Sequence, residues 1–187
     1  MTRKQEAERS DQEHVDAALA GDRTAYSILV RRHQGALYRY LVRMVASPDD
    51  ALDLTQEAFV RAWQALPQWE PGAQFRTWLY RIASNAALDV LRRRKTVEFV
   101  PLDDTFEAAD PAAGPERQAQ VSQQLRELDA ALARLTPEHR EVLLLREIED
   151  MSYEEIGRVL SLSEGTVKSR LARARAALIE ETGRKTS

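Results

Sequence analysis

The sequence predicts an all-α protein, built as two small helical domains joined by a flexible acidic linker. Apolar residues recur at helical spacing along most of the 187-residue chain, and strand-like alternation is nearly absent. Most glycines and prolines fall at breaks between these periodic segments. Between residues 96 and 115 the chain has five acidic residues and no lysine or arginine, a composition typical of a linker. We therefore expect a first domain over residues 13–95, a linker over 96–117 and a second domain over 118–182.

Four helices are expected in the first domain. Residues 13–20 form a short helix, and a second helix, capped by Asp22, extends to about residue 46. Ser47 followed by a proline and two acids is a strong start for the third helix. After a loop at 67–74, a fourth helix covers about 75–94. The apolar residues of the last three helices that we expect in the core are Tyr26, Leu29, Val30, Leu37, Leu41, Val45, Leu52, Leu54, Ala58, Phe59, Ala62, Trp63, Phe75, Trp78, Leu79, Ile82 and Ala86.

The second domain ends in a helix-turn-helix pattern. A Thr-Pro pair at 136–137 starts one helix, and a capping box that begins at Ser152 opens the next, over residues 153–160. Two residues separate that helix from a third, basic helix over residues 163–175. Two short helices in this arrangement place the second one in a position to read the major groove. The expected core edge of the first of these helices is Val142, Leu143, Leu145 and Ile148.

The basic helix has an apolar edge and a polar face on a wheel of about 100° per residue. Its apolar edge is Val167, Leu171, Ala174 and Leu178. The residues that we expect to face base edges are Thr166, Ser169 and Arg173, with Ala172 against a thymine methyl group. The flanking cations, which would hold phosphates, are Lys168, Arg170 and Arg175. A solvated surface helix would show the same charge run, but the capped helix before it, the short turn and Gly157 favour DNA binding.

The fourth helix of the first domain carries a second candidate nucleic-acid surface. Opposite its buried edge lies a stripe of Thr77, Arg81, Ser84, Asn85 and Leu88, which continues into a basic run with Arg92 and Arg93. Trp69 lies in the polar Pro/Gly loop before this helix, where an aromatic ring can stack on an unpaired base. A hydrophobic plug is an equally good interpretation of Trp69.

Composition narrows the classes of function. Net charge is only −3, but the charge is segregated, with basic residues at 92–95 and beyond 163 on either side of the acidic linker. The absence of cysteine excludes disulfides and thiolate metal sites. No signal peptide is evident and no run approaches the roughly 20 apolar residues of a membrane span, so we expect a cytoplasmic protein without membrane insertion. The isolated histidines His14, His33 and His139 match no catalytic, metal or phosphate-loop spacing, so we expect no enzyme, no metal and no cofactor.

Three segments in order resemble the extracytoplasmic-function (ECF, group 4) sigma factors of the sigma-70 family. They are DDALDLTQEAF at 49–59, FRTWLYRIASNAA from 75 and continuing to 94, and the stretch from LTP at 135–137 to residue 175. The resemblance covers about residues 13–180. It implies a bacterial initiation factor that binds core RNA polymerase and directs promoter-specific transcription, with its first domain (σ2) on the −10 element and its second (σ4) on the −35 element.

The resemblance also implies roles for individual residues. Asp49, Asp53, Gln56 and Glu57 match the stretch that contacts the clamp helices of the polymerase β′ subunit, whereas Phe59 is expected in the core. Trp69 and Asn85 match positions that line the pocket for a flipped −10 base, and we assign the remaining stripe residues and the basic run after them to the same DNA. The linker resembles the segment that threads the polymerase cleft. Ser161 departs from the glycine common at its position, so we expect the turn to be shaped differently.

The expected partners are core RNA polymerase (β′ clamp helices and β flap), promoter DNA and an anti-sigma factor. Two other interpretations stay open from sequence. A helix-turn-helix regulator that does not bind polymerase would explain the second domain but leave the first without a role. An adaptor that binds only proteins would show no affinity for promoter fragments.

Overall fold

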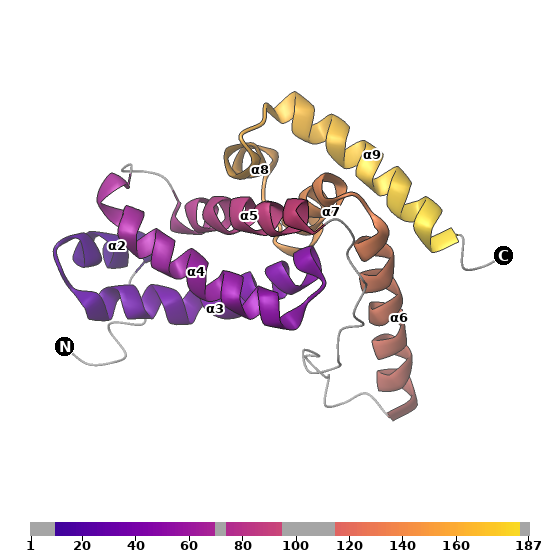
Figure 1. Cartoon of the computed structure of the whole chain (residues 1–187), viewed down its shortest axis with the longest axis horizontal. Helices are drawn as coiled ribbons and strands as arrows, with labels where there is room; N and C mark the ends of the chain where they lie inside the picture. Colours follow the sequence, from indigo (N-terminus) through magenta and orange to yellow (C-terminus); the bar gives the residue numbers. More distant parts are fainter. Residues whose placement is uncertain (1–9, 70–73, 95–114, 184–187) are drawn as a thin grey trace.

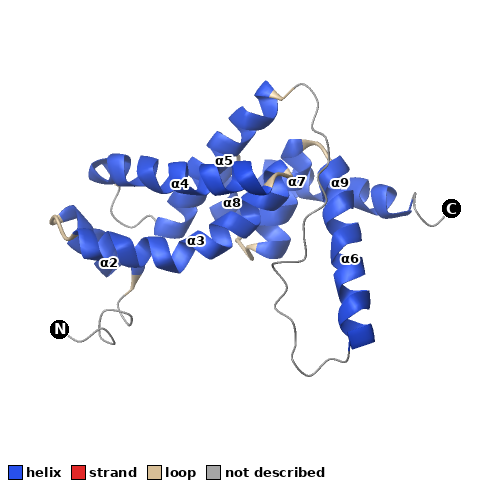
Figure 2. Ribbon diagram, turned by 60° about the horizontal axis from the view of Figure 1, so that its bottom comes forward, coloured by secondary structure: helices blue, strands red, loops and turns tan. Residues whose placement is uncertain are grey.

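The computed structural model describes residues 10–69, 74–94 and 115–183, with the backbone alone over 115–122. Throughout these residues the regular elements are helical, which confirms the predicted fold class (Figures 1 and 2). Most of the predicted linker lies outside the described residues. The elements are α2 (Asp11–Leu19), α3 (Arg23–Val45), α4 (Pro48–Ala65), the 3₁₀ turn η1 (Leu66–Gln68), α5 (Phe75–Arg93), α6 (Pro115–Arg134), α7 (Pro137–Leu143), the π-helical turn η2 (Leu144–Ile148), α8 (Tyr153–Leu160) and α9 (Glu164–Gly183).

Side-chain caps set the starts of the first three helices. The Asp22 carboxylate accepts from the backbone N–H of Thr24 at 2.9 Å, and the Ser47 hydroxyl caps α4 just before its proline. The predicted start of the first helix at residue 13 is two residues late, because Ser10 and Glu13 form a capping box that begins α2 at residue 11.

An ion-pair cluster holds α2 against α3. Asp11 lies 2.6 Å from the His33 ring nitrogen and 2.9 Å from the Arg32 guanidinium. The hydrogen bond from His33, followed by that from Arg32, lowers the pKa of Asp11 to about 2, although partial burial opposes the change. This carboxylate therefore stays ionised over the physiological range.

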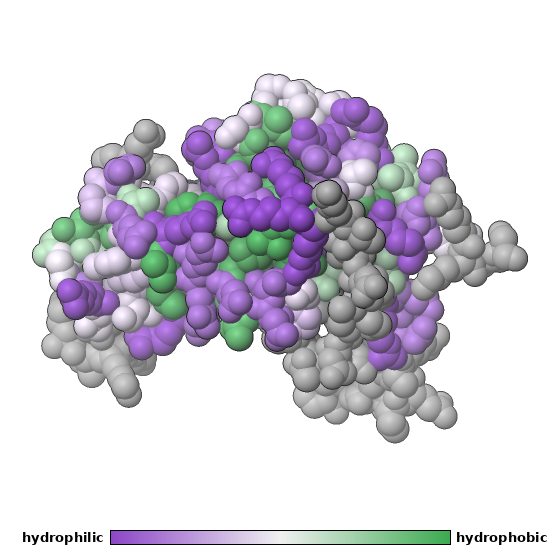
Figure 3. Space-filling model, viewed as in Figure 1, coloured by the Kyte–Doolittle hydropathy of each residue, from purple (hydrophilic) through white to green (hydrophobic). Residues whose placement is uncertain are grey.

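The buried core matches most of the predicted apolar positions, and Phe59 is buried as expected. Three predicted core residues are wrong: Leu52, Trp63 and Ile148 are 51%, 37% and 47% exposed. Leu52 lies on the exposed side of α4. Trp63 is only partly covered, by the ring of Tyr26 of α3, with centroids 4.8 Å apart. Figure 3 shows the resulting mixed surface, a mostly hydrophilic face interrupted by apolar patches.

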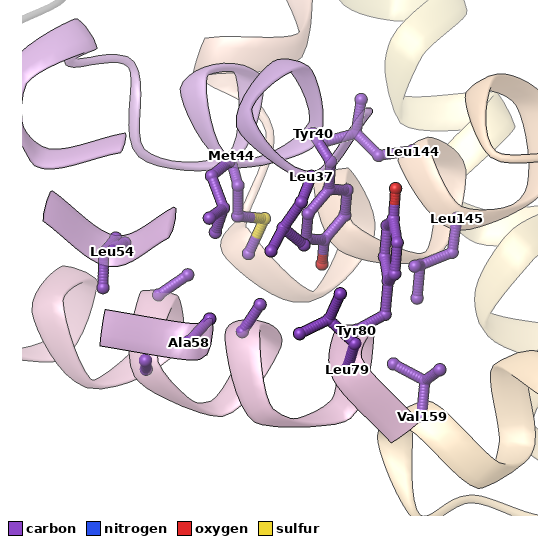
Figure 4. Close-up of a cluster of buried hydrophobic side chains, with 14 of the residues drawn as sticks. Leu37, Tyr40, Met44, Leu54, Ala58, Leu79, Tyr80, Leu144, Leu145 and Val159 are labelled. Carbon is purple, nitrogen blue, oxygen red and sulfur yellow. The ribbon is translucent and has the colours of Figure 1, made fainter. Parts of the chain in front are cut away.

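The two predicted domains pack against each other through one continuous apolar core. Tyr40 and Tyr80 of the first domain, with ring centroids 5.1 Å apart, lie beside Leu144 and Leu145 of the second (Figure 4). All four side chains are fully buried. Helix α8 lies along α5, and α3 contacts α6, α7 and η2. The linker boundaries predicted from sequence therefore separate two domains that share a buried interface in this structure.

The π-helical turn was not predicted, and it changes the face that the chain presents after α7. Backbone N–H groups of Glu149 and Met151 reach back to the carbonyls of Leu144 and Leu145, each at 3.0 Å. Asp150 then takes a left-handed conformation with φ 50°. The inserted residue rotates Ile148 out of the predicted core edge.

No helix among the described residues is long and apolar enough to cross a membrane.

Candidate nucleic-acid interface

The turn between α8 and α9 is tight and backbone-bonded. Helix α8 begins with the predicted capping box of Ser152 and Glu155. It ends at Ser161, where φ is 55° and ψ 46°, and the N–H of Leu162 donates to the carbonyl of Gly157 at 2.9 Å. The expected reshaping of this turn by Ser161 is wrong, because serine takes the left-handed conformation that glycine favours. That conformation costs a non-glycine residue about 1–2 kcal/mol.

Gly157 allows a close backbone approach between α8 and the turn that follows it. A Cβ atom at this position would lie 2.7 Å from the carbonyl oxygen of Leu162, closer than real Cβ contacts come. The missing side chain is therefore what lets the turn fold back against α8. This contact fixes how α9 leaves the turn.

Helix α9 presents its predicted polar face to solvent. Val167, Leu171 and Ala174 are buried, as the wheel predicted. The Ser163 hydroxyl caps the helix by accepting from the N–H of Thr166 at 3.3 Å. The predicted DNA-facing residues that are exposed are Lys168, Ser169, Ala172, Arg173 and Arg175, while Thr166 and Arg170 are half-buried.

The cations of this face differ in their partners. Arg175 pairs with Glu147 of η2 at 2.6 Å, and this hydrogen-bonded pair raises the arginine's pKa. Lys168 lies 3.8 Å from Glu164. Among the described residues no carboxylate pairs with Arg173, whose Nε donates to the Ser169 carbonyl at 3.3 Å. Arg173 is thus an exposed cation that no described carboxylate neutralises, as donation to a base or phosphate requires.

The structure divides the predicted stripe on α5. Arg81, Asn85, Arg92 and Arg93 are exposed, and Leu88 is half-buried. Thr77 and Ser84 are 6% and 1% exposed. With Trp69, which is 8% exposed, three of the eight residues predicted for the −10 strand are therefore covered in this arrangement.

Trp69 occupies a buried aromatic cluster at the start of α5. It is 8% exposed, with its ring centroid 5.2 Å from that of Trp78 in an edge-on arrangement and 6.2 Å from that of Phe75. Its indole N–H has no hydrogen-bond partner in the structure. In this structure Trp69 fills the hydrophobic space beside Phe75 and Trp78. Its stacking on an unpaired base stays a prediction.

The predicted polymerase-binding residues share an exposed face of α4 with apolar side chains that sequence reasoning assigned elsewhere or left out. Asp49, Asp53, Gln56 and Glu57 are all exposed. The apolar residues beside them at helical spacing are Leu52, Val60 and Trp63, exposed by 51%, 55% and 37%. Leu52 lies three residues after Asp49 and one residue before Asp53. This spacing could have indicated that Leu52 shares the exposed face with the two aspartates. Exposed apolar groups rimmed by acids are typical of a protein-binding surface.

The described residues contain no group of three histidine or acidic side chains that could hold a metal ion. His33 is hydrogen-bonded to Asp11, and His14 is buried in α2. The geometry therefore centres on two basic helical faces and one acidic-apolar face.

Comparison with known proteins agrees with this geometry. The family model for sigma-70 region 2 matches residues 29–97, and that for sigma-70 region 4 matches residues 125–178. The ECF RNA polymerase sigma factor SigM of Mycobacterium tuberculosis is 39% identical over 176 residues, which cover 94% of this chain and 86% of that protein. The chain belongs to the ECF RNA polymerase sigma factors.

One further relative and one solved structure are also similar to this chain. The ECF sigma factor SigE of Mycolicibacterium smegmatis is 40% identical over 161 residues, or 83% of this chain, but the match spans only 62% of that relative's length. The solved structure of CnrH in complex with the cytosolic domain of CnrY superposes with a TM-score of 0.68 at 32% identity, covering 91% of this sigma factor and 95% of CnrH. CnrH therefore shares the helical fold of this chain over nearly its whole length.

Proposed function

We propose that this sigma factor binds core RNA polymerase and directs it to promoters through separate surfaces on its two domains. The observation that carries the proposal is the exposed basic face of α9, set by a tight turn on α8, in a chain whose first domain has a second basic helix and an acidic-apolar face. A regulator acting by DNA occupancy alone needs only the first of these surfaces.

In the second domain, α9 enters the major groove of the −35 element. Its apolar edge is used for packing, so only the face with Ser169, Ala172 and Arg173 is free to approach base edges. Arg173 supplies a bidentate donor suited to guanine, while Lys168 and Arg175 hold the phosphates. For Arg175 this contact means exchanging Glu147 for a phosphate, so its contribution depends strongly on salt.

In the first domain, α5 holds the −10 strand. Arg81, Arg92 and Arg93 are exposed and supply the positive charge, with Arg81 and Arg92 on one side of the helix and Arg93 about 100° around it. Asn85 can donate and accept at an exposed base edge. Capture of an unpaired base offsets part of the energy of opening the duplex. Thr77 joins this surface only when the second domain moves away from α5. Ser84 is hydrogen-bonded to Tyr40 of the first domain at 2.6 Å, so separation of the domains alone does not free it.

The exposed face of α4 is the polymerase-binding surface. Leu52, Val60 and Trp63 give it an apolar centre, and Asp49, Asp53 and Glu57 give it an acidic rim. This face is turned away from the described second domain, so polymerase can reach it without displacing α8 or α9. We propose the β′ clamp helices as its partner.

An anti-sigma factor is the proposed inhibitor. CnrH, which shares this fold at 32% identity, is bound to the cytosolic domain of CnrY in its solved structure. Burial of the exposed apolar residues of α4 by such a partner would block polymerase directly.

Run-off transcription with purified bacterial core polymerase on a pool of promoter fragments tests the function. Defined transcripts that appear only with this protein are expected. A matched control is the Leu52→Asp variant, which leaves the DNA-facing helices unchanged but should abolish transcripts and comigration with core. Absence of transcripts together with absence of comigration for the wild type would favour a regulator that does not bind polymerase.

A further inference from the structure

A polar cluster joins the two domains near the N-terminal end of α5. The Glu149 carboxylate accepts a hydrogen bond from the Tyr80 hydroxyl at 2.6 Å and from the Arg76 guanidinium at 2.9 Å. Arg76 also donates to the Glu149 backbone carbonyl at 2.5 Å. The Glu149 side chain is 7% exposed, so these charge-assisted bonds are shielded from water. The residues Arg76, Tyr80 and Glu149 are called the latch below.

The local backbone is shaped to aim Glu149 at α5. The π-helical turn that starts at Leu144 places the Glu149 N–H on the Leu144 carbonyl and advances the chain by one residue relative to an α-helix. Asp150, with φ 50°, then reverses the chain toward α8. Aspartate tolerates the left-handed region better than most residues. An uninterrupted α-helix would rotate Glu149 away from Arg76.

A second buried contact closes the other end of the interface. The Arg140 guanidinium of α7 donates to the Met44 carbonyl in the last turn of α3 at 2.5 Å, and to the Leu132 carbonyl in the last turn of α6 at 2.9 Å. Burial lowers the pKa of Arg140 to about 10, so it remains a cation at neutral pH. It therefore satisfies carbonyls at two helix C-termini that would otherwise lack partners. Arg43 and Asp129 add an ion pair at 3.0 Å beside it.

The interface covers part of the proposed −10 surface and leaves the −35 surface open. On α5 the latch residues Arg76 and Tyr80 lie next to Thr77, which is 6% exposed and has a hydroxyl without a partner. On α9 the exposed residues Ser169 and Arg173 face away from α5. A buried hydroxyl with no partner is costly unless another state uses it.

Promoter geometry is incompatible with two packed domains. Elements at −10 and −35 are centred roughly 25 base pairs apart, or about 85 Å at 3.4 Å per base pair. Two contacting domains of about 70 residues have centres only about 30 Å apart. The 21 residues between the end of α5 at 93 and the start of α6 at 115 can reach at most about 75 Å when extended. The covalent connection thus permits the opening that the promoter requires.

We propose that the free protein is held closed by the latch of Arg76, Tyr80 and Glu149, and that the latch must break before the first domain can engage the −10 strand. The closed state follows from the interface alone, while its effect on DNA rests on the proposed function. The closed protein presents one complete DNA surface, on α9, and one incomplete surface, on α5.

Distance measurement in the absence of DNA and polymerase tests the closed state. The chain has no cysteine, so Gln64→Cys on α4 and Ala176→Cys on α9, both exposed, can carry a fluorophore pair without background labelling. The wild type should give one short, narrow distance. Glu149→Ala should raise the extended population about 30-fold or more, because it removes the acceptor of a half-buried arginine and a buried tyrosine. Glu154→Gln, an exposed acid on α8 that pairs only within its own helix in the described structure, is the charge-matched control and should leave the distance unchanged.

A milder variant guards against unfolding. Tyr80→Phe removes one hydroxyl and keeps the ring in the core, so it should raise the extended population about 5-fold, with helicity by circular dichroism unchanged. A broad, long distance in the wild type would overturn the proposal, as would identical distances in the wild type, Glu149→Ala and Tyr80→Phe.

Thiol reactivity tests which part of α5 is covered. Thr77→Cys should be alkylated slowly in the latched protein and at least about 10-fold faster with Glu149→Ala, while the exposed Asn85→Cys should react rapidly in both. Equal rates for Thr77→Cys in both backgrounds would show that the first domain alone buries this site. Neither readout uses transcription, so a closed protein that fails to support run-off transcription would refute the proposed function and leave the latch standing.

Discussion

The stability of this protein should depend on pH through one buried carboxyl group, Glu141 of α7. Its side chain is 1% exposed, and one carboxylate oxygen has no hydrogen-bond partner. Burial raises the pKa of Glu141 from an ordinary 4.5 to about 7, and Ser84 opposes this rise. The titratable or polar groups that face it are Tyr40 of α3, Ser84 and Arg92 of α5, Glu138 of α7 and Arg170 of α9.

The sign follows from proton linkage. In the unfolded chain Glu141 ionises near 4.5, so between 4.5 and about 7 the folded protein binds the extra proton. The free energy of unfolding therefore falls as pH rises through this window, and above pH 7 the penalty is fully present. The rise of the pKa corresponds to about 3 kcal/mol.

Urea unfolding of the wild type and Glu141→Gln at pH 5 and pH 8 measures this penalty. Glutamine mimics the protonated carboxyl and cannot ionise, so its advantage over the wild type should grow by about 2–3 kcal/mol between these pH values. All other groups titrate equally in both proteins and cancel. Parallel pH profiles for the two proteins would refute the reasoning, because they would show that Glu141 is ionised at little cost in the fold.

Three further predictions concern the two domains. Gly157→Ala should destabilise the protein by about 1–3 kcal/mol, since the added Cβ meets backbone at 2.7 Å; an unchanged melting temperature would contradict the role of this contact. Arg173→Ala should weaken binding to a −35 duplex about 10-fold or more in a gel-shift titration, while Arg61→Ala on the exposed side of α4 should have no effect; equal affinities would remove α9 as the reader. Asp11→Asn should cost about 1 kcal/mol at neutral pH. Because the pKa of Asp11 is about 2, the stability that it contributes should be lost as pH falls from 3.8 to 2, and an acid-unfolding curve identical to that of the wild type would exclude it.

Local signals in the sequence predicted the helices and the helix-turn-helix well. Ser47, Thr136 and Ser152 mark helix starts because their hydroxyls satisfy backbone N–H groups within three residues, an interaction that needs no distant partner. The apolar edge of α9 could be assigned for the same reason, since Val167 and Leu171 share a face by helical period alone.

The interface between the domains could not be predicted from local patterns. Glu149 reads as a solvent-exposed acid in a charged stretch, and only the π-helical turn after Leu143 directs it to Tyr80. Leu52 fits a helical core pattern, but the pattern does not tell which side of α4 lacks a covering helix. Ser84 was placed on a DNA-facing stripe. It is buried instead, because it is hydrogen-bonded to Tyr40, which lies 44 positions earlier in the chain.

The central claim is that two surfaces of one sigma factor, on α5 and α9, read separate promoter elements. Measuring how transcription depends on each element tests this claim most directly. Run-off transcription would be measured on one promoter and on two derivatives, each with either the −35 or the −10 element replaced, using the wild type, Arg173→Ala and Asn85→Ala. We predict that Arg173→Ala lowers transcription of the intact promoter, and that replacing the −35 element does not lower transcription by this variant any further. Asn85→Ala should likewise lower transcription of the intact promoter, and replacing the −10 element should not lower transcription by that variant any further. If both variants responded alike to both replacements, α5 and α9 would not read separate elements and the account would be wrong.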